Sequence, residues 1–414
     1  MMRSVTPYIL TGLFLLLWMS PASQAPAREI FFDRFGPEQG LHSRQVRNIV
    51  QSSDGFIWMA TNEGLVRYDG KDFDLFYDKA VPMEFSANRY IETMILDDHD
   101  RIWIGSNDQV VIYDIHAGRW QYLKDTAGST AIFPVQFVYD SLRHRMWIAS
   151  QHGLFYADTS HTLHRFSFIE SRYDHMLFNT VSIEQNSTLW MGNTYGYYHV
   201  DPNTSQVEQF HIPDATPTKP DAEGIFSSYL QGDTILWLGG WGTGLIRHDL
   251  RRGTATRYFY TDPSKEMNAV YSIIRADIHG QSHWLWVGSL KGLMAFDTDT
   301  RRFTPYHTQD IFNYKGVTGA VFSFFEDADQ ALWIGSGDGL FRYDPRKQGV
   351  DKIDLNPFEL CFPVDNIAFE NIQPGTEQIW FTIPYCGWHK YNLKTKEIEA
   401  LPESLQRELK DAGI

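Results

Sequence analysis

Short apolar runs alternate with polar, glycine-containing turns along most of the chain. The first such stretch has β-rich runs at 46–50, 57–59, 65–68 and 73–77, with a tight turn at 53–55 between the first two. Turn signals that recur about every 8 to 12 residues are typical of strands joined by hairpins. The pattern therefore predicts an all-β chain of four-stranded antiparallel units, with helical periodicity nearly absent.

One tryptophan-centred pattern repeats eight times. Its central residues, spaced 43 to 49 positions apart, are Trp58, Trp103, Trp147, Trp190, Trp237, Trp286, Trp333 and Trp380. These positions hold eight of the 13 tryptophans, and the segment LWIGSGDGLFRYD around Trp333 is representative of the repeat. Four antiparallel strands in each 43 to 49 residues predict the blades of a β-propeller.

Two further positions recur within the repeat. A small residue stands two places after the tryptophan (Ala60, Gly105, Ala149, Gly192, Gly239, Gly288 and Gly335), and Thr382 is the exception. We expect it to let the neighbouring sheet approach the tryptophan strand. An aspartate ends the third strand (Asp69, Asp114, Asp158, Asp201, Asp249, Asp297 and Asp344), with Asn392 in the eighth unit. Its regular place at a hairpin end favours a turn-forming role over a metal or catalytic one.

The combination of a central tryptophan, a small residue, Gly-Leu and an aromatic-Asp pair resembles the two-component regulator propeller repeat. The segment FDRFGPEQGLHSRQVRNIVQSSDGFIWMATNEGL is especially similar to the first repeat of such sensors. The resemblance implies the extracytoplasmic sensor region of a hybrid two-component system, which binds ligands, often glycan fragments, and signals to a kinase. The sequence shows neither an immunoglobulin-like domain nor a kinase core after the repeats. Either a standalone propeller or a truncated sensor half is expected, and no signalling output is assigned.

The number of blades is open at this point. The segment 29–35, around Phe31, resembles the outermost strand of a blade, and we expect it to complete the last blade and close the ring. Eight repeats favour eight blades if the chain is self-contained. The family resemblance favours seven, with the Trp380 unit left over as an extra repeat.

The N-terminus predicts export. Arg3 precedes an apolar run over 8–19, and small residues follow up to Ala27, as in a cleaved signal peptide. We therefore expect a signal peptide over 1–27 and a propeller over 28–414, periplasmic or secreted, with no membrane span after cleavage. The net charge of −15, without a Lys/Arg-rich run, argues against nucleic acid as a partner.

Candidate ligand-binding residues come from two loops of each blade that we expect to share one face. Aromatic residues on glycine-containing or irregular turns suit stacking on a sugar or another apolar ligand. These are Trp241, Tyr195, Tyr385 and Trp388. The loops before the innermost strands and the equivalent turns add polar candidates, which are Arg89, Tyr90, His152, His175, Lys291 and Lys315.

The two cysteines, Cys361 and Cys386, both fall in the eighth repeat. Propeller topology would place them on the same face of one blade, and an oxidising compartment favours a bridge between them. We therefore expect a disulfide, with two separate buried thiols as the alternative.

Known motifs for nucleophilic catalysis, zinc, phosphate or dinucleotide binding are absent from the sequence, and we assign no cofactor, metal or catalytic residue. The sequence favours a non-catalytic propeller that binds a small molecule or an oligosaccharide, with a signalling protein as a further partner. The alternatives are a propeller enzyme of the streptogramin-lyase type and a scaffold for protein–protein interaction.

Overall fold

The computed structural model describes residues 32–76, 90–106, 109–125, 132–213, 224–260, 268–276, 283–306 and 316–347, with Ile30. Nearer the C-terminus it describes 378–383, 387–392, 398–400, Ser404 and Arg407. The chain forms two units, Met1–Gln348 and Gly349–Ile414. A helix apolar and long enough to cross a membrane does not occur among the described residues.

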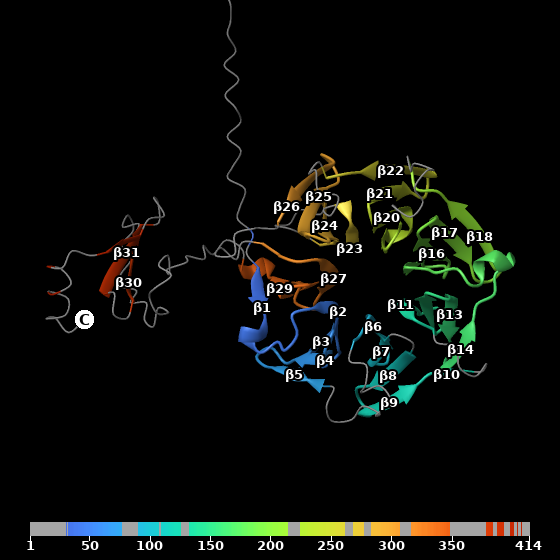
Figure 1. The fold of residues 1–414 in the computed structure, drawn as a ribbon, viewed down its shortest axis with the longest axis horizontal. Helices are drawn as coiled ribbons and strands as arrows, with labels where there is room; N and C mark the ends of the chain where they lie inside the picture. The colour runs from blue at the N-terminus through green and yellow to red at the C-terminus, as the bar shows by residue number, and fades with distance from the viewer. Residues whose placement is uncertain are drawn as a thin grey trace, which may run out of the picture. The chain divides into compact units, whose positions relative to one another are not determined.

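The first unit is a ring of seven antiparallel sheets, the blades of a β-propeller (Figure 1). Blade 1 contains β2 (Val46–Gln51), β3 (Ile57–Thr61), β4 (Gly64–Tyr68) and β5 (Phe73–Leu75), from the axis outward. Blade 2 contains β6 (Thr93–Leu96), β7 (Arg101–Ser106), β8 (Gln109–Asp114) and β9 (Arg119–Tyr122). Blade 3 contains β11 (Pro134–Asp140), β12 (Arg145–Ser150), β13 (Gly153–Ala157) and β14 (Thr162–Arg165), and β10 (Lys124–Asp125) adds a parallel fifth strand.

The remaining blades follow the same order. Blade 4 contains β15 (Thr180–Ile183), β16 (Leu189–Asn193), β17 (Gly196–Asp201) and β18 (Gln206–Phe210). Blade 5 contains β19 (Ser227–Gln231), β20 (Ile235–Gly240), β21 (Gly244–Asp249) and β22 (Thr254–Tyr258). Blade 6 contains β23 (Val270–Arg275), β24 (Trp284–Ser289), β25 (Gly292–Asp297) and β26 (Arg302–Pro305). Blade 7 contains β27 (Val321–Glu326), β28 (Leu332–Ser336), β29 (Gly339–Tyr343) and β1 (Asp33–Phe35).

Helical structure in the first unit is confined, among the described residues, to short 3-10 turns. They are η1 (Pro37–Gln39), η3 (Ser171–Tyr173), η5 (Gly232–Thr234) and η7 (Pro345–Lys347). The all-β prediction is therefore confirmed.

The preference for eight blades is wrong, and the ring closes with seven. Strand β27 of blade 7 contacts β2 of blade 1 directly, so no space is left between them for another blade. The Trp380 repeat belongs to the second unit, as a three-stranded sheet of β30 (Gln378–Ile383), β31 (Gly387–Asn392) and β32 (Ile398–Ala400). This outcome matches the alternative of seven blades with one extra repeat.

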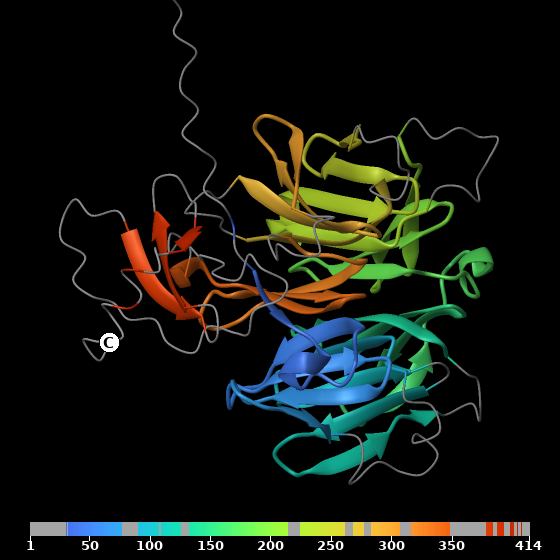
Figure 2. The ribbon, with the colours of Figure 1, turned by 60° about the vertical axis from the view of Figure 1, so that its left-hand side comes forward.

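The N-terminal strand closes the ring, as expected, although it completes the seventh repeat and not the eighth. Strand β1 pairs with β29 through Asp33 and Arg342 at one end and Phe35 and Leu340 at the other. Figures 1 and 2 show β1 beside β29, although more than 300 residues separate them in the chain. Blade 7 thus obtains its fourth strand from the start of the chain, which explains why the Trp380 unit is not needed. Phe31 lies outside the described residues.

The anchor tryptophans and the small residues pack as the repeat predicts. The seven tryptophans of the ring are at most 4% exposed. In five of them the indole N–H donates to a side chain six residues earlier, as from Trp103 to Asp97 at 2.9 Å. A Cβ atom placed on Gly335 would lie 2.7 Å from the carbonyl oxygen of Val46 in the next blade. The small residue is therefore required because neighbouring blades approach each other closely there.

The recurrent aspartates form turns, as expected. Asp69 accepts the backbone N–H groups of Lys71 and Asp72 at 2.8 and 2.7 Å. Equivalent bonds to backbone N–H groups are made by Asp114, Asp158, Asp201, Asp249, Asp297 and Asp344. In all seven blades these carboxylates stabilise the turn that follows the third strand.

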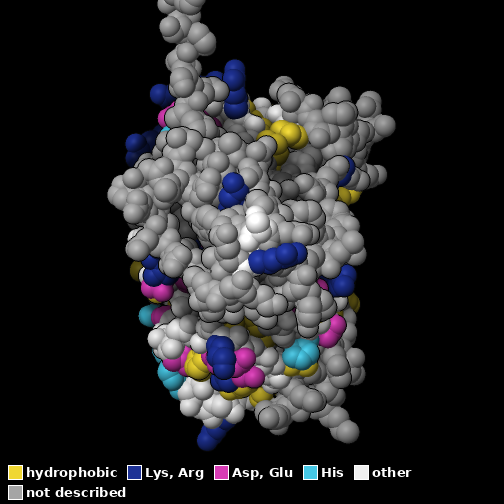
Figure 3. Space-filling model, turned by 90° about the vertical axis from the view of Figure 1, so that its left-hand side faces the viewer, with side chains coloured by type: hydrophobic (Ala, Val, Ile, Leu, Met, Phe, Trp, Pro, Cys, Tyr) yellow, Lys and Arg dark blue, Asp and Glu magenta, His cyan; other side chains and the backbone are white. Residues whose placement is uncertain are grey.

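The outer surface near the closure mixes charges of both signs. Asp33 contacts Arg342 at 2.8 Å and Lys347 at 3.0 Å, and Arg67 pairs with Asp74 at 2.9 Å. On this side of the molecule the visible basic and acidic side chains are interspersed (Figure 3).

Closure can be tested at Phe35. Its ring lies 5.8 Å from the rings of Tyr68 and Phe73 in blade 1 and from that of Trp333 in blade 7. Phe35→Ala should lower the free energy of unfolding by about 2 to 3 kcal/mol, because it removes aromatic packing across the closure. Urea unfolding measures the change, with Leu142→Ala, at a position 65% exposed, as the control. Equal effects of the two substitutions would contradict the closure role.

Closure should also depend on pH through Asp33. Partial burial raises the pKa of this carboxyl, but hydrogen bonds and attraction from Arg342 and Lys347 outweigh burial and leave the pKa below its usual value. A lowered folded-state pKa stabilises the fold above the unfolded-state pKa, and the contribution is lost as pH falls through the folded-state value. Asp33→Asn should therefore destabilise the protein near neutral pH by less than about 1 kcal/mol, since the pair is partly exposed. In a pH series of urea unfolding, this difference should vanish in acid; a constant difference would contradict it.

Candidate functional site in the axial cavity

All seven blades line one cavity at the axis of the ring. Its volume is about 570 Å³. The innermost strands and the residues just before them provide its walls, so the side chains come from segments spread over most of the first unit. No segment of the chain forms the cavity alone, and it exists only when the ring is closed.

One position in each blade points a side chain into this cavity, and its residue type varies around the ring. We call it the variable slot, and its seven occupants, in blade order, are Arg47, Glu92, Val135, Asn179, Phe226, Tyr271 and Phe322. In blade 1 the register passes from the Val46–Thr61 pair directly to the Asn48–Ala60 pair, which leaves Arg47 as an extra, unpaired residue. Blades 3, 6 and 7 have the same β-bulge. A bulge changes the direction of a side chain without ending the strand, which explains how the slot faces the axis in these four blades.

The residue after the variable slot is polar in every blade. These residues, which we call the polar ring, are Asn48, Thr93, Gln136, Thr180, Ser227, Ser272 and Ser323, each paired across the sheet with the small residue of its repeat. All except Thr180 line the cavity. Ser272 Oγ donates to the Val321 carbonyl of the next blade at 3.2 Å, whereas the buried Ser323 Oγ has no hydrogen-bond partner among the residues that the structure describes. The polar ring therefore brings polar side chains into the cavity from six of the seven blades.

Arg47 and Glu92 form the charged side of the cavity. Their side chains are 3.2 Å apart, and the Arg47 guanidinium lies over the rings of Tyr90 and Phe322, at 5.0 and 4.8 Å. Burial raises the pKa of Tyr90 strongly, and its hydrogen bond to Glu92 and the negative charge of Glu92 raise it further. The pair neutralises itself, so this side presents charged hydrogen-bonding groups without net charge.

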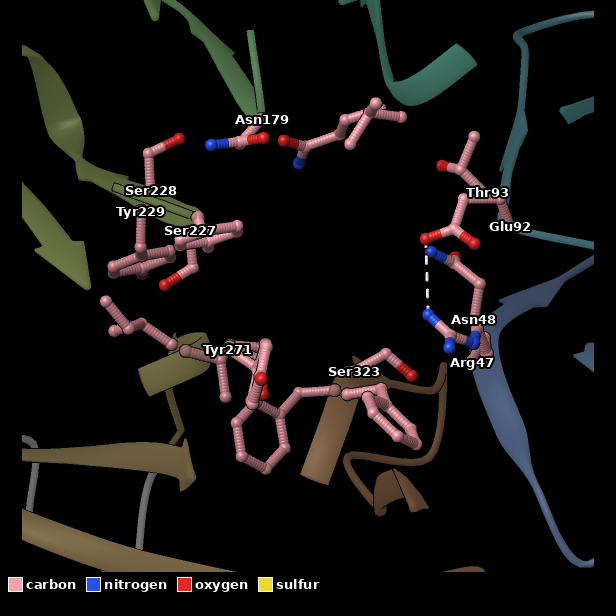
Figure 4. Close-up of a pocket in the computed structure, with 18 residues that line it drawn as sticks. Arg47, Asn48, Glu92, Thr93, Asn179, Ser227, Ser228, Tyr229, Tyr271 and Ser323 are labelled. Carbon is pink, nitrogen blue, oxygen red and sulfur yellow. Dashed lines mark hydrogen bonds and ion pairs between the residues drawn. The ribbon is translucent and has the colours of Figure 1, made fainter. Parts of the chain in front are cut away.

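Aromatic and hydroxyl groups form the opposite side. Ser227, Ser228 and Tyr229 lie across the cavity from Arg47 and Glu92, and Tyr271 lies between the two sides (Figure 4). Burial raises the pKa of both tyrosines, so their hydroxyls are neutral donors and acceptors at ordinary pH. The cavity can therefore offer hydrogen bonds in both senses together with flat apolar rings.

The described lining contains one carboxylate, Glu92, and no histidine. Two clusters elsewhere bring His and Asp ligand atoms within 4.8 Å of each other, namely Asp97, Asp98 and His99, and His283, Asp297 and Asp299. Asp97 already bonds to Arg101 and Trp103, and Asp297 bonds to the backbone of its own turn. Both clusters lie outside the lining of the axial cavity.

The predicted aromatic residues Trp241 and Tyr195 are exposed, at 48% and 58%. They occupy the equivalent turns of blades 5 and 4, at the end of the strands where the variable slots lie. Tyr90 lies at the rim of the axial cavity, against Arg47. These three predicted residues therefore lie on or near the face that opens to the cavity.

The predicted histidines lie together on that face. One nitrogen of Arg165 bonds to the carbonyl oxygens of His152 and Asp174, and lies 3.5 Å from His175 Nδ1. Both imidazoles are exposed. Lys291 is exposed in the equivalent turn of blade 6.

Several predictions fall outside the described residues. These are Arg89, Lys315, Tyr385, Cys361 and Cys386, so both the disulfide and the alternative of two thiols remain predictions. Trp388 lies in strand β31, paired with Thr382, and not in the preceding turn as expected.

Sequence reasoning missed the variable slot and the polar ring. A signal for the ring exists, because a polar residue stands 12 positions before the small residue in five of the seven blades, as with Asn48 and Ala60. The variable slot has no shared residue type. It can be found from the sequence only by its place next to the ring.

Comparison with known proteins gives the fold a context. No family model matches the chain. The extracellular domain of a putative hybrid two-component system from B. thetaiotaomicron superposes with a TM-score of 0.63, at 17% identity over 90% of this chain. That of a putative one-component system from the same organism gives 0.61, at 16% identity over 89%. The chain has the fold of these sensor propellers.

The resemblance noted from the repeats is thus confirmed at the level of the fold. The chain spans 49% and 47% of the two solved extracellular domains. A histidine kinase of Formosa agariphila is 23% identical over 223 residues, which are 51% of this chain and 15% of the kinase. A streptogramin B lyase gives a TM-score of 0.57, at 13% identity over 76% of this chain and 97% of the lyase, and is likewise a propeller relative in fold.

The charged side of the cavity can be tested with a double-mutant cycle on Arg47→Met and Glu92→Gln. We expect a coupling of up to about 1 kcal/mol in the free energy of unfolding, because both side chains are partly exposed. High salt should reduce the coupling by screening the charges. A coupling of zero at low salt would mean that the Arg47–Glu92 pair does not stabilise the cavity wall.

Proposed function

We propose that this propeller is an extracytoplasmic ligand-binding domain of the sensor type, and that its axial cavity binds an uncharged polyhydroxylated molecule such as a glycan fragment. Binding takes place without catalysis. The ligand-bound propeller then acts through a partner signalling protein. The observation that carries the proposal is the cavity itself, where seven blades converge with polar and aromatic side chains.

The size and lining of the cavity support a small polar ligand. Its volume of about 570 Å³ lies within the usual range for small-molecule sites. Asn48, Gln136 and Asn179 supply amide groups that both donate and accept, and the serines add hydroxyls. A sugar presents the same alternation of donors and acceptors around its ring, so such a lining can satisfy many of its hydroxyls.

The charge of the lining supports an uncharged ligand. Arg47 is already paired with Glu92 at 3.2 Å, so an anionic ligand would have to displace this carboxylate or be buried next to it. Burying an unpaired charge costs free energy, and repulsion from the Glu92 carboxylate would add to the cost of burying an anion. A neutral polyol can instead accept from Arg47 and donate to Glu92 without breaking the pair.

An extracytoplasmic location is supported by the signal-peptide pattern over 1–27 and by the fold shared with extracellular sensor domains. The same likeness supports a role in signalling. The chain spans about half of those domains, so the signalling step itself belongs to the proposal.

The proposal is tested by binding of neutral saccharides to the chain from residue 28 onward. A panel of disaccharides and longer oligosaccharides is screened by thermal shift, and hits are measured by calorimetry. A ligand well above its dissociation constant must raise the melting temperature. Tyr271→Ala together with Asn48→Ala should weaken binding at least tenfold, whereas Leu142→Ala, on an exposed turn at the other end of the strands, should not.

Two results would count against the proposal. One is that no saccharide of the panel shifts the melting temperature of the unmodified protein. The other is that a bound saccharide is recovered cleaved or otherwise converted, which would make the propeller an enzyme.

A further inference from the structure

We infer that Tyr195 and Trp241 form an outer platform that extends the axial site, so that the preferred ligand is an oligosaccharide longer than the cavity can hold. The inference rests on the proposed function. It adds a second subsite of different chemistry, in which the flat rings of the platform stack on the apolar face of a sugar.

The backbone that carries Trp241 is fixed. Thr243 is fully buried, and its hydroxyl bonds to the carbonyl oxygens of Gly224 and Trp241, at 2.8 and 3.1 Å. Arg257 donates from Nε to the Thr243 carbonyl at 2.6 Å and from a second nitrogen to that of Gly242 at 2.9 Å. The turn is therefore held from both sides while its indole ring stays 48% exposed.

The turn that carries Tyr195 is held in a similar way. The side chain of Asn193 is buried, and its Oδ1 accepts the backbone N–H of Tyr195 at 2.7 Å and the hydroxyl of Tyr198 at 3.2 Å. The phenol ring of Tyr195 is 58% exposed. Two rigid turns thus present two exposed rings, which lowers the ordering entropy that a ligand must overcome on binding.

The two turns are neighbours, because a single residue lies between them. A Cβ atom placed on Gly224 would lie 3.3 Å from Thr194 Cα, next to Tyr195. A Cβ atom placed on Gly240, next to Trp241, would clash with the carbonyl oxygen of Gly224. Gly240 therefore has to be glycine, since the approach of these backbones leaves no room for a side chain.

The platform is continuous with the axial cavity. From Gly224 the chain reaches Phe226, in the cavity wall, within two residues, a distance of at most about 7 Å. Ile225 between them donates to the Asn193 carbonyl at 2.9 Å and accepts from Asn179 Nδ2 at 3.1 Å. One short segment thus links the Trp241 turn, the Tyr195 turn and two occupants of the variable slot.

The exposure of these rings has no packing explanation in the described residues. Burying a large aromatic side chain gives a favourable free energy, because its apolar surface leaves water. About half of this free energy is absent at Trp241 and Tyr195, because their rings stay exposed. Stacking on a sugar would recover it while leaving the sugar hydroxyls in water. The neighbouring polar cavity makes a saccharide a better occupant than an apolar protein surface, because one chain can then use both subsites.

The test measures affinity against ligand length. The probes are a disaccharide and the hexasaccharide of the same neutral series, chosen from the panel that binds the unmodified protein. We expect the hexasaccharide to bind at least tenfold more tightly. Trp241→Ala should remove most of this gain with less than a twofold change for the disaccharide. Tyr195→Ala should act in the same direction.

Controls separate the platform from the fold and from the cavity. Trp241→Phe should keep most of the length dependence, and an unchanged melting temperature shows that the turn is intact. Leu142→Ala should bind both probes like the unmodified protein. Tyr271→Ala should weaken both probes in parallel, because it alters the cavity that they share.

The possible failures are distinct. If the disaccharide and the hexasaccharide bind equally, or if Trp241→Ala leaves both affinities unchanged, the platform is not a saccharide subsite, although axial binding stands. If no saccharide binds the unmodified protein, the proposed function fails and this inference fails with it.

Discussion

The close approach of neighbouring blades beside each anchor tryptophan is the contact on which the rest of the structure depends. Each of the seven anchor tryptophans of the ring is almost fully buried, and the small residue two positions later lets the next blade come near. At Gly105 an added Cβ would lie 2.7 Å from Thr93 of its own blade and 2.8 Å from Pro134 of the next. Because this contact recurs around the ring, it sets the spacing of the innermost strands and therefore the width of the axial cavity.

Repetition made the blade predictable, but it could not determine how many blades close into one ring. The tryptophan, the small residue and the turn aspartate each have a local physical reason, and the structure confirms all three. Closure depends instead on a pairing between β1 and β29, which are almost a whole ring apart in sequence. Eight equal repeats carry no information about which of them receives the N-terminal strand. The choice of eight failed at this long-range step.

Some residues of the candidate site could likewise be predicted from the sequence, and others could not. Trp241 and Tyr195 could be found because an exposed aromatic residue on a turn departs from the repeat, and both are exposed in the structure. Arg47, Asn48 and Tyr271 could not be found by that route. Their strands contain ordinary β-forming residues, and only the bulge turns Arg47 and Tyr271 toward the axis. A bulge is a property of strand register, and register requires the partner strand.

The variable slot and the polar ring show how a repetitive scaffold acquires an asymmetric site. The ring keeps one chemical character, since Asn, Thr, Gln and Ser all fit beside a small residue. Gln136, Ser227 and Ser272 also bond to the backbone of the next blade. One residue earlier, the side chain varies around the ring, from Arg47 and Glu92 to Phe226 and Tyr271. The packing constraint acts on the tryptophan, the small residue and the ring, but not on the slot. The slot occupants can therefore differ from blade to blade while the packing that closes the ring stays the same.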